Sequence, residues 1–178
     1  MFACNKEEEG VYNKDIFTSN SWLPVSVVID YDVAFFLAGL QVTTSDTSID
    51  LYDEYGYCEM DLEYIYLNTG KAQLETGGTY CLTDVSPATI LNYGRWFVYE
   101  DVLFVHYDVG DTLNTEDDDI DLNGIGRTFI ELNDESMVLE TVIPMSDKLL
   151  NELYKSEIDA GFSVTGTITR TETYESAM

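Results

Sequence analysis

Short runs of alternating apolar and polar residues, separated by turn-forming residues, constrain the fold of this chain most strongly. A period of two residues is typical of a β-strand with one buried face, and the intervening residues are those that hairpin turns prefer. The runs occupy residues 60–66, 71–75, 94–99, 102–107, 127–132 and 137–143, and the turns fall at 68–70, 100–101 and 133–136. Sequential hairpins with few long crossovers predict an all-β, antiparallel up-and-down barrel rather than a Greek-key sandwich.

The first and last strands of this sheet are also predicted from alternation. The first strand is expected to place five apolar residues on one face: Leu23, Val25, Val27, Ile29 and Tyr31. The apolar run 33–40 that follows fits either a core strand or a short helix. Phe162, Val164 and Ile168 share one face of the last strand. Apolar residues at helical spacing predict one short helix at residues 148–158, just before that strand.

The charge balance limits the classes of partner. The 178 residues fit one domain, and 34 acidic against 8 basic residues give a net charge of -26. Such a surface repels phosphate backbones and anionic lipid headgroups, so we expect neither nucleic acid nor direct membrane contact as its partner. Cations, basic proteins and neutral ligands remain, and the alternative is that the charge only keeps the domain soluble and monomeric.

The N-terminus resembles a signal for lipidation and export. Met1–Phe2–Ala3–Cys4 resembles the end of a bacterial lipoprotein signal peptide, and the segment from Cys4 to Glu8 resembles the surface-export signal of Bacteroidota lipoproteins. This resemblance implies lipid on Cys4, a place in the bacterial outer membrane and exposure at the cell surface. Residues 1–18 are then a lipobox remnant with a flexible tether, and residues 19–178 are the barrel domain. The alternative is a stray thiol near a flexible terminus.

Two cysteines remain once Cys4 is assigned to lipid. Cys58 and Cys81 form an even pair, and in an oxidising compartment outside the cytoplasm we expect them to form a disulfide. A zinc site is the weaker alternative, because these two thiols and His106 leave a tetrahedral coordination sphere incomplete without carboxylates.

Beyond the terminus, the chain resembles the small lipocalin-like lipoproteins of Bacteroidota. The matching features run in order from Trp22 to Leu139: Trp22, Cys58, the turn at 68–70, Gly77–Cys81, Gly94–Trp96 and the hairpin at 129–139. The resemblance implies a lipocalin-like barrel of about eight strands whose interior can hold a small apolar ligand. Asn20 stands where the lipocalin pattern has Gly, and an acidic insertion follows Tyr107; both weaken any transfer of ligand identity.

Aromatic residues on the predicted strands are the candidates for ligand binding. They are Tyr64, Tyr66, Trp96, Phe104 and Phe129, and they either line a cavity or fill a closed core. The lipocalin resemblance also implies that Arg170 covers Trp22 in a cation–π contact at the end of the barrel. If the last strand frays near the terminus, Arg170 is solvated instead.

The sequence offers little that would support catalysis. His106 is the single histidine, and the sequence has neither a Gly-x-Ser-x-Gly motif nor a phosphate-binding glycine loop. We therefore expect that the protein is not an enzyme and has no cofactor. Calcium is the alternative cofactor, because Asp119, Asp121 and Asn123 followed by Gly resemble the opening of a calcium loop. The usual Glu at the twelfth position is replaced by Ile130, and a solvated acidic loop explains the same residues.

Two functional hypotheses follow. The first is a lipid-anchored barrel that binds a small apolar molecule, attached to the membrane by its lipid only and monomeric. The second is a β-sandwich adhesion or glycan-recognition module, stabilised by calcium. The two differ in whether the strand aromatics point inward or form an outer patch.

Overall fold

The strands form one antiparallel sheet that closes into an eight-stranded barrel with one additional strand. The computed structural model describes residues 10–51, 62–76, 90–107 and 124–177. The strands are β1 (Ser21–Leu37), β2 (Leu40–Asp50), β3 (Leu62–Tyr66), β4 (Lys71–Thr76), β5 (Ile90–Tyr99), β6 (Val102–Tyr107), β7 (Arg127–Leu132), β8 (Ser136–Pro144) and β9 (Ser163–Ala177). Pairing of β1 with β9 closes the barrel, and β2 pairs with β1 outside it. The predicted fold class is confirmed.

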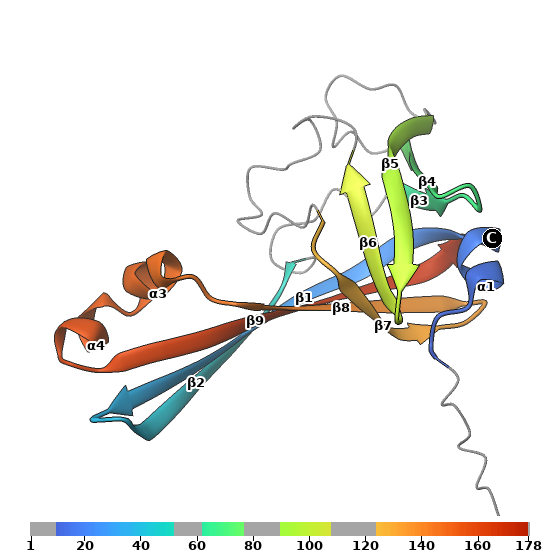
Figure 1. Ribbon diagram of the computed structural model, residues 1–178. Coiled ribbons are helices and arrows are strands. Elements are labelled where there is room, and N and C mark those ends of the chain that lie inside the picture. Colours follow the sequence, from blue (N-terminus) through green and yellow to red (C-terminus); the bar gives the residue numbers. More distant parts are fainter. Residues whose placement is uncertain (1–9, 52–61, 77–89, 108–123, 178) are drawn as a thin grey trace, which may run out of the picture.

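Two strands are much longer than the barrel needs, and they build a second part of the molecule. β1 and β9 stay paired from Ser21↔Ala177 to Phe36↔Ser163, so they continue past the barrel as a ribbon. We call this extension the arm: residues 28–50 of β1 and β2, residues 163–171 of β9, and the helices α3 (Asp147–Leu153) and α4 (Lys155–Asp159). Figure 1 shows the arm projecting to the left of the barrel, with both helices near its far end.

A bulge in β1 changes which residues face inward. The register shifts between Pro24 and Ser26, so Trp22 and Pro24 are buried before the bulge, and Val27 and Ile29 are buried after it. An extra residue in one strand reverses the alternation of its side chains. The predicted single face running from Leu23 to Tyr31 is therefore wrong in its first part, while the strand itself and its continuation through residues 33–37 are confirmed.

Apolar residues gather in two separate clusters rather than one. The barrel cluster includes Trp22, Tyr66, Leu103, Phe129 and Met137. The arm cluster includes Val33, Phe35, Leu150 and Ile168, with Leu150 contributed by α3. The predicted helix before the last strand is present as two short helices, because the backbone leaves the helical conformation at Tyr154 (φ -123, ψ 31). None of the helices in the described ranges is long and apolar enough to cross a membrane.

Candidate functional site

One end of the barrel is closed by α1 (Lys14–Ser19). Asn13 caps this helix, because its side-chain oxygen accepts hydrogen bonds from the backbone N–H groups of Asp15 (3.0 Å) and Ile16 (3.4 Å). The helix carries Phe17 into the barrel, where its side chain is fully buried. The expectation that residues 1–18 form a flexible tether is therefore wrong for the segment from Asn13 to Thr18. Two adjacent apolar residues, Ile16 and Phe17, among polar neighbours gave no periodic signal for this helix.

Phe17 is the centre of the aromatic packing at this end. Its ring stacks on Tyr66 (centroids 4.4 Å apart) and meets Trp96 and Phe129 edge-on at 5.0 Å and 5.3 Å. The carbonyl oxygen of Phe17 also accepts a hydrogen bond from Nε1 of Trp22 (3.1 Å). The closed end is thus packed with rings, and the buried indole N–H group of Trp22 has a backbone acceptor.

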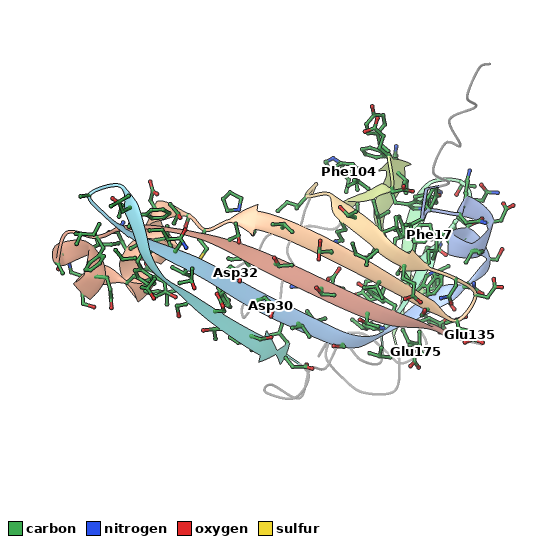
Figure 2. The ribbon with its side chains drawn as sticks, turned by 90° about the horizontal axis from the view of Figure 1, so that it is seen from below. Phe17, Asp30, Asp32, Phe104, Glu135 and Glu175 are labelled. Atoms are coloured by element: carbon green, nitrogen blue, oxygen red, sulfur yellow. The ribbon has the colours of Figure 1, made fainter. Side chains whose placement is uncertain are left out.

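Four of the five predicted ligand-binding aromatics lie inside the barrel. Tyr64, Tyr66, Trp96 and Phe129 belong to the barrel cluster. Phe104 faces the outside of β6, where it stacks on Phe97 of β5 with 4.9 Å between centroids. Figure 2 labels Phe17 and Phe104 at separate places on the barrel. Three of the inner rings contact Phe17, so they form the floor of the barrel beside α1.

A buried charged cluster lies on the inner face of the strands between the two apolar clusters. Arg127 of β7, Arg170 of β9 and Glu172 of β9 are 4%, 5% and 4% exposed. Nε and Nη2 of Arg170 both lie 3.0 Å from Oε1 of Glu172, and Nη1 of Arg127 lies 3.6 Å from Oε2 of the same carboxylate. We call these three residues the charged triad. Buried charges are tolerated only when they are paired in this way.

Strand alternation explains why the triad points inward. Arg170, Glu172 and Tyr174 follow Ile168 at two-residue intervals on β9, and all four side chains are buried. Arg127 likewise shares the inner face of β7 with Phe129. Sequence analysis identified Arg170 but missed Arg127 and Glu172; the signal that could have found them was their parity with neighbouring apolar residues.

The carboxylate of Glu172 is ionised within the barrel. Burial raises the pKa of Glu172, but the charges of Arg127 and Arg170 and the hydrogen bond from Arg170 lower it more, so the pKa lies below its ordinary value. Tyr174 also donates a hydrogen bond to this carboxylate, but its buried Oε2 atom has no close hydrogen-bond donor among the described residues, since Nη1 of Arg127 lies 3.6 Å away. A buried acceptor without a donor costs about 1–3 kcal/mol.

The pairing of β1 with β9 corrects the expected stacking of Arg170 over Trp22. Arg170 lies opposite Ile29, whereas Trp22 lies opposite Ser176. The two positions are six residues apart along β9, which corresponds to about 20 Å at 3.3 Å per residue. Arg170 reaches Glu172 instead, and α1 covers Trp22.

The remaining predicted residues lie outside the described ranges. These are the lipidation site Cys4, the disulfide pair Cys58 and Cys81, and the calcium residues Asp119, Asp121 and Asn123. His106 is described and exposed on the outer face of β6. Among the residues that the structure describes, no group of three His, Cys, Asp or Glu side chains is placed to hold a metal ion.

No protein-family model, curated protein or solved structure matches the chain.

Proposed function

We propose that this protein binds a small, mostly apolar molecule inside its barrel and carries out no catalysis. The supporting observation is the charged triad, a polar group enclosed between two apolar clusters. Binding sites for small molecules are mostly apolar and contain a few polar groups that fix the orientation of the ligand. The closed sheet favours this proposal over the alternative β-sandwich.

The position of the triad determines where the ligand would bind. Phe17 and the rings around it pack against one another at the end closed by α1. We therefore propose that the ligand binds away from this end. The triad lies toward the arm, and Oε2 of Glu172 has no close hydrogen-bond donor in the described part of the chain. A ligand hydroxyl or amine that donates to Oε2 would remove the cost of this acceptor. We therefore propose an apolar molecule that carries one such donor.

The location of the protein is part of the same proposal. The resemblance of residues 1–8 to a lipoprotein export signal supports lipidation at Cys4 and display on the outer membrane. This can be tested by labelling cells that express the protein with radioactive palmitate and comparing them with cells that express a Cys4→Ser variant. A lipid anchor is supported if the protein incorporates the label and partitions into the detergent phase, and if both properties are lost in the variant. Equal labelling of the two proteins would contradict the proposed lipid anchor at Cys4.

The binding proposal is tested by native mass spectrometry of protein purified from its own envelope. We expect an additional small mass that is released by organic solvent. Glu172→Gln should reduce the occupied fraction about tenfold, since it changes the proposed hydrogen-bonding group. Phe104→Ala is the matched control, because this aromatic lies outside the barrel and should leave the occupancy unchanged. A bare mass for the wild-type protein would contradict the proposal.

A further inference from the structure

The outer edge of β2 has no neighbouring strand in the described ranges. β2 pairs with β1 on one side, and no strand in the described part of the chain pairs with its other side. Residues 40–48 are all exposed, so no described residue covers this part of the strand. A long free edge presents a row of unpaired backbone N–H and C=O groups, to which another strand can be added.

The face of the ribbon beside this edge is acidic. Asp32 of β1 lies directly opposite Asp46 of β2, and Asp30 lies two residues before Asp32 on the same face. Like charges directly opposite each other destabilise a strand pair. None of these three carboxylates forms an ion pair with a residue of the described chain. Figure 2 shows Asp30 and Asp32 close together along β1 in the arm.

Neighbouring residues do not neutralise these charges. On the other side of β1, the residues opposite Asp30 and Asp32 are Thr169 and Thr167. The lysines of the arm helices are engaged elsewhere, Lys148 with Glu152 at 3.8 Å and Lys155 with Asp159 at 3.0 Å. The edge of β2 thus combines unpaired backbone groups with negative charge that lacks a nearby cation.

We propose that the free edge of β2 binds an extended, basic segment of a partner protein as an additional strand. Backbone hydrogen bonds to the edge supply affinity in such complexes, and alternate side chains supply specificity. Asp46 and Asp50 lie on the same face of β2, four residues apart. An added strand also has a period of two, so its basic residues should be four apart to face both carboxylates.

The negative charge of the protein favours a basic segment over a second copy of the protein as the partner of the β2 edge. Each copy carries a net charge of -26, and pairing two β2 edges would bring further carboxylates beside Asp46. Opposite charges across neighbouring strands are favourable, whereas like charges are not. A basic segment therefore fits the edge, and the protein itself should remain monomeric.

The test uses the full chain and two synthetic peptides of identical composition. The first has a Lys-Thr-Val-Thr-Lys core, which places both lysines on one face. The second has a Lys-Lys-Thr-Val-Thr core, which places them on opposite faces. We expect the first peptide to bind at low salt and to slow amide hydrogen exchange in β2. The Asp46→Asn/Asp50→Asn variant should bind it about tenfold more weakly, whereas Asp134→Asn, an equal type of change at a turn outside the arm, should have no effect.

Three outcomes would overturn the proposal. One is equal affinity for the two peptides, which would indicate adsorption by net charge alone. Another is undiminished binding by the first peptide after N-methylation of every core residue, since such a peptide offers no backbone N–H group on either edge for a strand ladder. The third is a dimer of the free protein with β2 at its interface, because a second copy would then be the occupant.

Discussion

The ring of Phe17 in α1 stacks on the ring of Tyr66 in β3, with 4.4 Å between centroids and 26° between planes. This contact joins a helix of six residues to a barrel strand far along the chain. A helix this short is not stable alone in water, so its packing against the barrel holds it in place. α1 is therefore an integral part of the barrel, and its loss should be measurable as a loss of stability.

Replacing Phe17 with alanine should destabilise the protein by about 3–5 kcal/mol, because it leaves a cavity among well-packed rings. Urea unfolding followed by tryptophan fluorescence measures this change. Tyr99→Ala is the control, since Tyr99 is 65% exposed and its removal should cost less than about 0.5 kcal/mol. Similar losses for the two variants would mean that Phe17 does not close the barrel in solution.

Replacing Glu172 with glutamine should cost about 3–5 kcal/mol at neutral pH, because it leaves two buried arginines without their carboxylate. The depressed pKa of Glu172 means that its contribution is fully present above pH 4.5 and is lost as the pH falls through the folded value. The difference in unfolding free energy between wild type and variant should therefore shrink in acid. It is measured by chemical denaturation from neutral to acidic pH, and a constant difference would contradict an ionised Glu172.

Replacing Leu150 with alanine should loosen the arm while leaving the barrel intact. Leu150 is the buried residue of α3, and it packs against the arm cluster, which is separate from the barrel cluster. Structural units with separate cores can open independently. Amide hydrogen exchange should accelerate in β2 and in residues 163–168 but not in residues 102–105. Equal acceleration in both regions would show that barrel and arm unfold as one unit.

Replacing Ala38 with asparagine should stabilise the turn that joins β1 to β2. Ala38 and Gly39 both have positive φ, at 51° and 82°. A left-handed conformation costs a residue such as alanine roughly 1–2 kcal/mol, and asparagine tolerates it better. We expect a gain of about 1 kcal/mol in calorimetry. Glu100→Asn, at another turn residue with φ of 49°, should shift stability in the same direction; a loss at both sites would contradict this explanation.

Strands in which apolar and polar residues alternate without interruption could be predicted from the sequence. The hairpins at 94–107 and 127–143, and the last strand, were predicted closely, because each combines a clear period of two with a short turn. The pairing of neighbouring strands follows from such short turns. The same strand patterns predicted Tyr64, Tyr66, Trp96, Phe104 and Phe129 as interior residues, and four of the five lie inside, whereas Phe104 lies on the outer face of β6.

Features that depend on contacts between residues distant in the sequence could not be predicted from local patterns. The bulge at Pro24 reversed the face of β1, and the length of the β1–β9 pairing placed Arg170 opposite Ile29 instead of near Trp22. β2 is rich in Thr, Ser and Asp and has no apolar face, so its place in the sheet depends on β1. Phe17 lies in a short helix without an apolar repeat, and its burial requires the barrel against which the helix packs. The charged triad likewise depends on the order of the strands, because β7 and β9 both pair with β8 and this brings Arg127 of β7 to Glu172 of β9.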